Sequence, residues 1–241
     1  TLFYQPQYRL SDSKLTSCEA LIRWRHPNLG IVGPGEFIEI AEQNGIIGQI
    51  TNYVLSEAAR QEKIWRQKGV FLPLSINISA ENITSLSLPE YLVKLLDDNM
   101  INSDMITLEL TEGAIVEELG CALDTLTRLR LKGIGLSIDD FGTGYSSLSQ
   151  LHKLPFSELK IDCSFVSKMM EDEEAKSIVK ACINLGHELN MTVVAEGIET
   201  IQQLELLKHF KCDIGQGYYY SKPVVPEALE KLADQSLRSI V

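Results

Sequence analysis

The chain has 241 residues, of which 44% are hydrophobic and 23% are charged, so it can build a large core and still be soluble. No apolar run approaches the roughly 18 residues that a membrane helix needs, which argues against membrane contact. The net charge of −11 argues against non-specific binding of nucleic acid.

The cysteines and histidines exclude two kinds of site. The five cysteines are odd in number, widely spaced and contain no Cys-x-x-Cys, and the four histidines form no pair with metal-ligand spacing. A disulfide framework or a zinc site is therefore not expected, and a reducing cytosol fits best. Any bound metal should have oxygen ligands, which favours Mg²⁺ or Mn²⁺.

Eight short runs rich in Ile, Val, Leu or Tyr predict buried strands, and helix-like stretches separate most of them. The runs lie at residues 2–9, 16–24, 71–78, 106–110, 134–139, 157–161, 192–195 and 213–220. One of the intervening helices is predicted from about residue 48 to 68, with Gly69 ending it. This alternation predicts an α/β fold, a TIM-like (β/α)8 barrel.

The first two runs are too close together for a crossover helix. Only turn-type residues such as Ser11, Asp12 and Ser13 separate residues 2–9 from residues 16–24. Two strands with so short a connection form an antiparallel hairpin. The sequence therefore predicts one antiparallel strand near the N-terminus of the barrel.

Polar residues occur at or just after the ends of the later strands, where an apolar core would not place them. They are Asn77, Glu109, Asp139, Asp140, Lys160, Glu196 and Gln216. One such acid alone would be read as a helix cap or a solvated residue. Together they predict an oxygen-ligand site for divalent cations, because the carboxyl ends of barrel strands form one face.

A glycine-containing loop follows the Asp pair, at residues 141–147. By itself it predicts only a tight turn, and it is no P-loop, because no Gly-Lys-Ser/Thr follows.

Eight motifs in order along nearly the whole chain, one of them a Glu-Ala-Leu stretch, resemble the EAL family. They are Tyr4-Gln5-Pro6, Glu19-Ala20-Leu21-Ile22-Arg23-Trp24, Asn77-Ile78-Ser79, Glu109-Leu110-Thr111-Glu112, Asp139 through Ser147, Lys160-Ile161-Asp162, Ala195 through Thr200, and Gln216-Gly217-Tyr218. The Glu-Ala-Leu match means little by itself, but the ordered set is specific.

The resemblance implies two metal ions. It makes Glu19, Asn77, Glu109 and Asp139 ligands of the first, with Asp139 shared between both. Asp140 and Glu196 would bind the second ion directly or support its ligands.

The resemblance also implies roles around the metals. Lys160 would hold the attacking water, and Glu112 would steady the loop that begins at Phe141. The residues expected to contact substrate or water are Gln5, Leu21, Arg23 and Gln216.

The implied activity is hydrolysis of cyclic di-GMP to linear pGpG, which lowers a bacterial second messenger. Two Mg²⁺ or Mn²⁺ ions about 3.5–4 Å apart can activate the attacking water. Ca²⁺, which prefers longer bonds and more ligands, is expected to inhibit.

We expect residues 1–241 to form a single EAL-type domain cut from a longer multidomain chain, since no initiator Met is present. That longer chain would carry a sensory, GGDEF or membrane region. The domain itself is expected in the bacterial cytoplasm, tethered to the inner membrane only through such outside regions. By resemblance, residues 141–170 are expected to mediate a homodimer.

Three alternatives stay open from the sequence. The first is a catalytically silent cyclic di-GMP receptor with the same fold. The second is another metal-dependent barrel enzyme of the enolase type, which Asn77 and the glycine loop fit poorly. The third is a protein-interaction scaffold.

Overall fold

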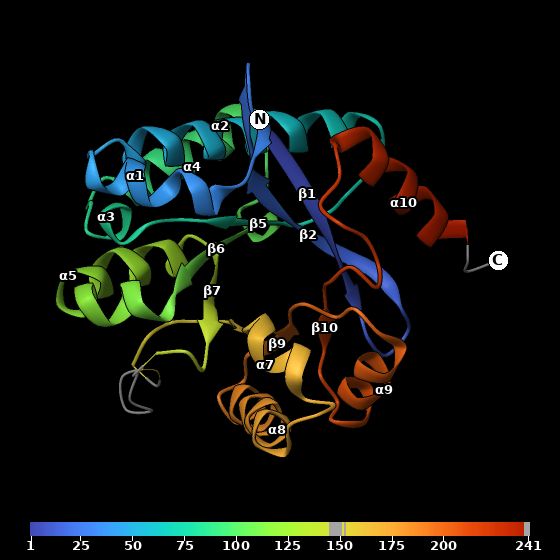
Figure 1. Ribbon diagram of the computed structural model, residues 1–241. Coiled ribbons are helices and arrows are strands. Elements are labelled where there is room, and N and C mark those ends of the chain that lie inside the picture. The colour runs from blue at the N-terminus through green and yellow to red at the C-terminus, as the bar shows by residue number, and fades with distance from the viewer. Residues whose placement is uncertain (145–150, 152, 239–241) are drawn as a thin grey trace.

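Eight strands close into a barrel that helices surround (Figure 1). The computed structural model describes residues 1–144, 151 and 153–238. The strand order around the barrel is β1-β10-β9-β8-β7-β6-β5-β2. Their bounds are β1 Leu2–Arg9, β2 Lys14–Ile22, β5 Leu74–Asn77, β6 Ile106–Thr111, β7 Gly135–Phe141, β8 Glu158–Ile161, β9 Thr192–Ala195 and β10 Ile214–Gly215. The predicted barrel is confirmed.

The helices connect the strands and cover the outside of the barrel (Figure 1). The α-helices are α1 Ile38–Gln43, α2 Ile47–Gln67, α3 Ala80–Ile83, α4 Leu88–Asn99, α5 Glu112–Leu131, α7 Cys163–Lys168, α8 Glu173–Glu188, α9 Ile201–His209 and α10 Pro226–Arg238; the 3-10 helices are η1 Pro34–Glu36 and η2 Ser103–Met105. The predicted helix 48–68 corresponds to α2, and Gly69 after it has φ +79°, a conformation that favours glycine.

Strand β1 is the reversed strand of the barrel. It pairs antiparallel with both of its neighbours, β2 and β10, whereas the other neighbouring pairs are parallel. The register places Gln5 opposite Glu19 and Gln7 opposite Ser17. The short connection after Arg9 therefore makes the predicted hairpin, and two inward-facing glutamines come to lie beside β2.

The barrel strands alternate between an apolar outer face and a polar inner face. On β6, Ile106, Leu108 and Leu110 are buried in the hydrophobic core, and Glu109 between them is also buried. Many barrels of this type are filled by branched aliphatic side chains. Here buried polar residues such as Gln7, Ser75 and Ser137 come from the inner faces, so the lumen below the strand ends is polar as well.

The last strand is shorter than the predicted run 213–220. It covers only Ile214–Gly215, because the chain then turns across the loop that follows β9. A Cβ atom on Gly217 would lie 2.2 Å from the backbone N and O of Ile198. Tyr219 N donates a hydrogen bond to Ile198 O, so this crossing replaces the predicted end of the strand.

A small sheet outside the barrel was not predicted. Strands β3 (Trp24–His26) and β4 (Gly30–Val32) pair antiparallel after β2 and lead into η1 and α1. Pro34, Gly35 and Ile38 of η1 and α1 line a cavity described below.

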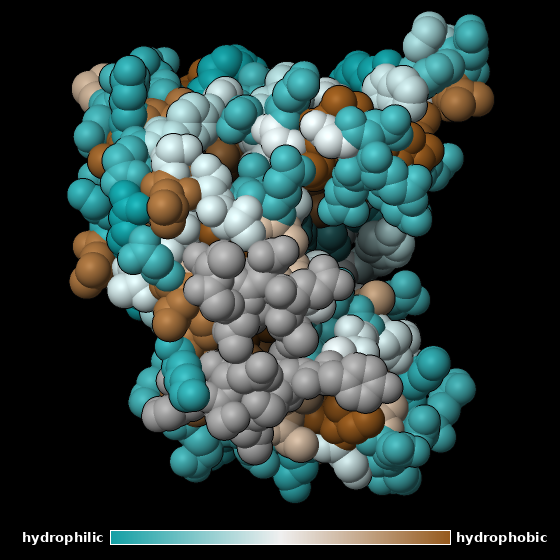
Figure 2. Space-filling view, turned by 90° about the vertical axis from the view of Figure 1, so that its left-hand side faces the viewer, coloured by the Kyte–Doolittle hydropathy of each residue, from teal (hydrophilic) through white to brown (hydrophobic). Residues whose placement is uncertain are grey.

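The side of the molecule near α1, α3 and α5 carries apolar side chains as small, separate groups among hydrophilic ones, outside the grey atoms of Figure 2. None of the helices in the described part of the chain combines the length and apolar character that crossing a membrane requires.

Candidate metal centre

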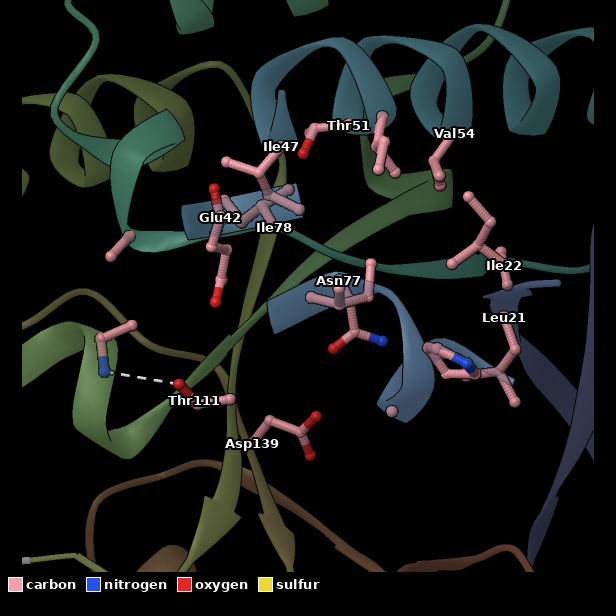
Figure 3. Close-up of a pocket in the computed structure, with 18 of the residues that line it drawn as sticks. Leu21, Ile22, Glu42, Ile47, Thr51, Val54, Asn77, Ile78, Thr111 and Asp139 are labelled. Atoms are coloured by element: carbon pink, nitrogen blue, oxygen red, sulfur yellow. Dashed lines mark hydrogen bonds between the residues drawn. The ribbon is translucent and has the colours of Figure 1, made fainter. Parts of the chain in front are cut away.

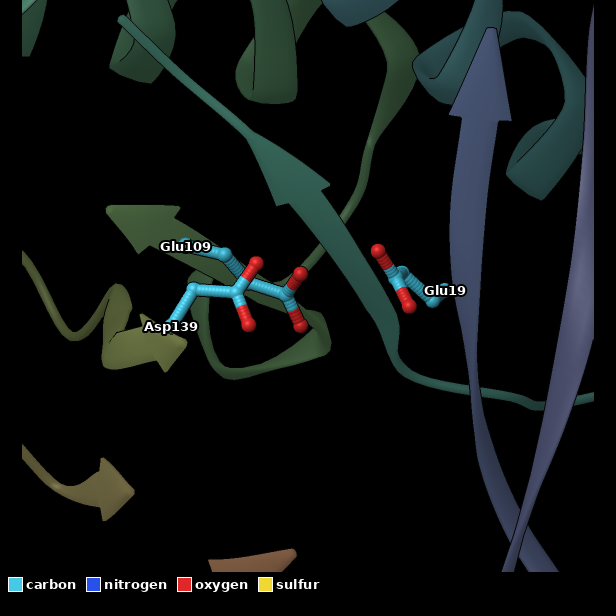
Figure 4. Close-up of side chains that lie close together, drawn as sticks. All are labelled: Glu19, Glu109 and Asp139. Atoms are coloured by element: carbon cyan, nitrogen blue, oxygen red, sulfur yellow. The ribbon is translucent and has the colours of Figure 1, made fainter. Parts of the chain in front are cut away.

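Three strands bring three carboxylates together at the carboxyl end of the barrel. Glu19 comes from β2, Glu109 from β6 and Asp139 from β7, and Figure 4 shows their side chains turned toward one another. One oxygen of each lies within 4.8 Å of the others, and all three residues are buried. We call them the first carboxylate group. Strand register positions them, since parallel pairing aligns the strand ends.

A second carboxylate group consists of Asp139, Asp140 and Glu196, with oxygens again within 4.8 Å of one another. Asp140 and Glu196 are only partly buried. Asp140 has φ +55°, and its backbone N–H donates to Asp139 Oδ1 at 3.0 Å. Asp139 therefore belongs to both groups, the arrangement expected of a ligand shared by two cations.

Lys160 lies at the junction of the two groups and is 1% exposed. Its Nζ is 2.9 Å from Glu109 Oε2, 2.9 Å from Asp139 Oδ1, 2.8 Å from Glu196 Oε1 and 3.6 Å from Glu19 Oε2. Burial opposes the charged form of this lysine. The carboxylates of Glu109, Glu19, Glu196 and Asp139 outweigh burial and raise the Lys160 pKa well above its usual value.

One buried ammonium does not neutralise so many carboxylates. Burial, and then the charge of Glu19, raises the pKa of Glu109 well above its usual range. Burial raises the pKa of Glu196 to about 8, despite Lys160 beside it. Burial and the neighbouring Asp139 raise the pKa of Asp140 to about 6. In the cation-free protein, protons therefore offset part of the negative charge of the cluster, and divalent cations could take their place.

The residues fit divalent cations of the Mg²⁺ or Mn²⁺ kind. Glu109 Oε1 is buried, and it has no hydrogen-bond partner among the described residues. Asn77 adjoins the first carboxylate group, where its Nδ2 donates to Glu19 Oε1 at 2.8 Å. All of these candidate ligands are hard oxygen donors.

Gln216 links the two groups. Its Nε2 donates to Glu19 Oε2 at 2.8 Å and to Glu196 Oε1 at 2.7 Å. Behind it lies Gln7, a fully buried residue that sequence reasoning missed. The only signal for Gln7 was its position two residues after Gln5 on one strand, which places both on the same face.

Glu112 holds the loop after β7. Its Oε2 accepts hydrogen bonds from the backbone N–H groups of Gly142 and Gly144, each at 3.1 Å. Gly142 has φ +101°, and a Cβ on Gly144 would lie 2.8 Å from the Glu112 carboxyl carbon. Both glycines are therefore needed for this contact. Residues 145–147 of the predicted loop lie outside the described residues.

Two cavities flank the carboxylates. The larger, about 670 Å³, runs from the strand ends to α1 and α2 and includes Asn77 (Figure 3). The smaller, about 390 Å³, is lined by Gln5, Glu196 and Gln216 among others. Of the described residues, three line both cavities: Glu19, Leu21 and Asp139.

Arg23 is the predicted contact residue that the structure does not bring to these cavities. It is absent from the described residues that line either one, and its Nη1 donates to Ile22 O at 2.8 Å. The other three predicted contact residues, Gln5, Leu21 and Gln216, line the smaller cavity.

A closed barrel with one reversed strand, strand-end carboxylates around a buried lysine, and cavities on either side defines a barrel domain with a candidate divalent-cation centre. The family model described as "EAL domain" matches residues 1–223, so this chain belongs to the EAL domain family.

Two curated relatives are similar along nearly the whole chain. The chain is 38% identical to cyclic di-GMP phosphodiesterase PA2567 of Pseudomonas aeruginosa and 40% identical to oxygen sensor protein DosP of Escherichia coli, over 95% of its length in both cases. It spans 39% and 29% of those two relatives, respectively.

Solved structures are similar along nearly the whole chain. The PaMucR phosphodiesterase in complex with c-di-GMP is 38% identical with a TM-score of 0.91, covering 95% of this chain and 93% of that one. An EAL domain protein from Listeria monocytogenes is 30% identical with a TM-score of 0.85, covering 97% of this chain and 92% of that one.

Proposed function

We propose that this chain is a metal-dependent phosphodiesterase that hydrolyses cyclic di-GMP to linear pGpG. The observation that carries the proposal is the pair of three-carboxylate groups that share Asp139 and surround Lys160. Its support from the relatives is that PA2567 is named a cyclic di-GMP phosphodiesterase and that PaMucR was solved with c-di-GMP. Family membership argues against an enolase-type lyase.

The two cavities suit a substrate with two similar halves. Cyclic di-GMP has two guanosine units joined by two phosphodiesters, and the carboxylates lie between a cavity of about 670 Å³ and one of about 390 Å³. We expect one guanosine in each cavity, which would bring one phosphodiester over Glu19 and Asp139. Leu21, which lines both cavities, would contact both halves.

Bound divalent cations would lower the pKa of a water molecule and offset charge on the phosphate. The chain's own residues would hold and orient the reactants. Glu19, Asn77, Glu109 and Asp139 would hold one cation, and Asp139, Asp140 and Glu196 the other. Lys160 would orient the attacking water through its Nζ and stabilise the negative charge that develops on phosphorus oxygens.

Hydrolysis adds water across one phosphorus–oxygen bond. The hydroxyl goes to phosphorus, and the ribose oxygen leaves with a proton, which opens the ring. The remaining phosphodiester then lies in a flexible chain that nothing holds over the carboxylates. Because this preorganisation is lost, the second cleavage should be much slower.

Incubation with cyclic di-GMP and Mg²⁺, followed by chromatography of the products over time, tests the proposal. We expect pGpG to accumulate, with GMP late or absent. GMP as the main early product would contradict the proposed reaction. Tight binding of cyclic di-GMP without turnover would instead identify a silent receptor.

The cellular location and the oligomeric state of this domain are also proposals. We expect this domain to act in the bacterial cytoplasm as part of a longer signalling protein, and to form homodimers through residues 141–170. Some of those residues lie outside the described part of the chain.

A further inference from the structure

A series of buried and partly buried hydrogen bonds leads from Ser17 on β2 through Gln7 to the carboxylates. Ser17 Oγ donates to Gln7 Oε1 at 2.7 Å, and Gln7 Nε2 donates to Gln216 Oε1 at 2.9 Å. Gln216 Nε2 then donates to Glu19 and Glu196 at 2.8 and 2.7 Å. Gln7 is 0% exposed, and its bond to Gln216 is buried.

When Glu19 and Glu196 are both ionised, as they would be with cations bound, the donors and acceptors in this series of hydrogen bonds allow one order. A carboxylate accepts hydrogen bonds, so Gln216 must turn its NH₂ toward Glu19 and Glu196. Its carbonyl oxygen then faces Gln7 and needs a donor there. Gln7 supplies its own NH₂, and its carbonyl oxygen is satisfied by Ser17. A rotated Gln216 amide would place its carbonyl oxygen against two carboxylate oxygens.

The bridge made by Gln216 joins residues of different groups. Glu19 belongs to the first carboxylate group and Glu196 to the second. Glu196 follows the end of β9, so strand pairing restrains it less than it restrains Glu19. Gln216 therefore ties the less restrained carboxylate to the more restrained one, and Gln7 fixes the plane of the Gln216 amide.

We propose that Gln7 is a positioning residue for the metal centre. Through Gln216, it holds Glu19 and Glu196 in the arrangement that binds divalent cations. This inference rests on the metal dependence in the proposed function. It gives a role to a residue of β1 that lies outside the motif Tyr4-Gln5-Pro6.

Gln7→Met tests the inference, because it keeps the side-chain volume and removes both hydrogen bonds. We expect Mn²⁺ to bind about 10-fold more weakly, the effect typical of losing an outer partner of a metal ligand. Titration calorimetry with Mn²⁺ alone measures this without catalysis. Ser17→Ala, which removes only the outermost bond, should weaken binding in the same direction but less. If Gln7→Met does not fold, as judged by circular dichroism, Ser17→Ala carries the test.

A double-mutant cycle separates positioning from a general packing role. If Gln7 acts through Gln216, adding Gln7→Met to Gln216→Met should cause no further loss of Mn²⁺ affinity. Losses that add would overturn the inference. Ser137→Ala is the matched control, since Ser137 is also a buried polar residue and makes none of the hydrogen bonds in this series. It should bind Mn²⁺ as the wild type does.

The wild-type titration distinguishes the possible failures. A wild-type protein that turns over cyclic di-GMP and binds Mn²⁺ no better than Gln7→Met would overturn the role of Gln7 alone. A wild-type protein that binds no Mn²⁺ would overturn the metal centre, and the role of Gln7 with it.

Discussion

The first and second carboxylate groups differ in what holds them in place. Glu19 and Glu109 of the first group lie within strands, where pairing to neighbours on both sides restrains the backbone. Asp140 of the second group has φ +55° where the β7–β8 register shifts, and Glu196 follows the end of β9. Asp139 is common to both.

The difference shows that strand pairing fixes the first carboxylate group more than the second, which depends more on side-chain contacts. The first carboxylate group is fully buried, whereas two of the three residues in the second are partly exposed. The second group depends on Glu112, which holds the loop after Asp140, and on Gln216, which holds Glu196. We therefore expect cation binding at the first carboxylate group to change little with loop substitutions or pH. Cation binding at the second group should respond to both.

The largest loss of turnover should come from a change in the first carboxylate group. Glu19→Ala removes a buried carboxylate that Asn77, Gln216 and Lys160 all contact. Turnover should fall by more than about 100-fold, because losing only an outer partner of a metal ligand already costs up to that much. Steady-state hydrolysis of cyclic di-GMP measures the loss. Glu62→Gln, a buried carboxyl on α2 away from the site, is the control and should keep its rate. If Glu19→Ala keeps wild-type turnover, the site is misassigned.

Exchanging the cation should separate binding from turnover at both groups. Mg²⁺ and Mn²⁺ should support hydrolysis, and chelation should abolish it. Ca²⁺ should bind the same oxygens, but its preference for more ligands and longer bonds should prevent turnover. Calorimetry would then detect Ca²⁺ binding without product formation. Full activity in Ca²⁺ alone, or activity after exhaustive chelation, is the result that would count against a two-cation reaction.

The second carboxylate group should be the more sensitive to changes at Glu112. Glu112→Ala removes the acceptor for Gly142 and Gly144, so Asp140 should lose its position. We expect turnover to fall about 10- to 100-fold. The cation held by the first group should bind almost as before, which a two-site Mn²⁺ titration can resolve. Glu112→Gln, which keeps one acceptor oxygen, should lose less. Wild-type rates in Glu112→Ala would show that the loop does not depend on this contact.

The same comparison explains what the sequence could predict. Glu109 interrupts an apolar strand, and Asp139 follows one. Period-2 alternation is therefore enough to predict that both lie near the carboxyl ends of the barrel strands. The contacts of Lys160 with four carboxylates could not be predicted, because they depend on how far neighbouring strands are shifted around the closed barrel.

Two features of the structure were missed in the sequence, each for its own reason. Gln7 looks like any polar strand residue until the pairing of β1 with β2 places Ser17 beside it. The β3–β4 sheet has strands of only three residues each, too short for a periodic signal. The contact of Arg23 with the substrate stays a prediction, and in the structure its Nη1 donates to Ile22 O.

The smallest expected effect concerns pH, and it again separates the two groups. Burial raises the pKa of Glu196 from its usual value near 4.5 to about 8 in the cation-free protein. The folded state then binds more protons than the unfolded chain between those two values, so the stability of the cation-free protein should fall as pH rises through this window and level off above it.

Cations compete with those protons for the same oxygens. The stabilisation by Mn²⁺ should therefore grow as pH rises through about 6 and then about 8, where Asp140 and Glu196 lose their protons. Thermal unfolding across this range, with and without Mn²⁺, measures the gap between the two curves. Glu196→Gln should flatten the cation-free curve, since a neutral amide does not titrate. A gap that stays constant with pH would show that the second carboxylate group is already ionised before cations bind.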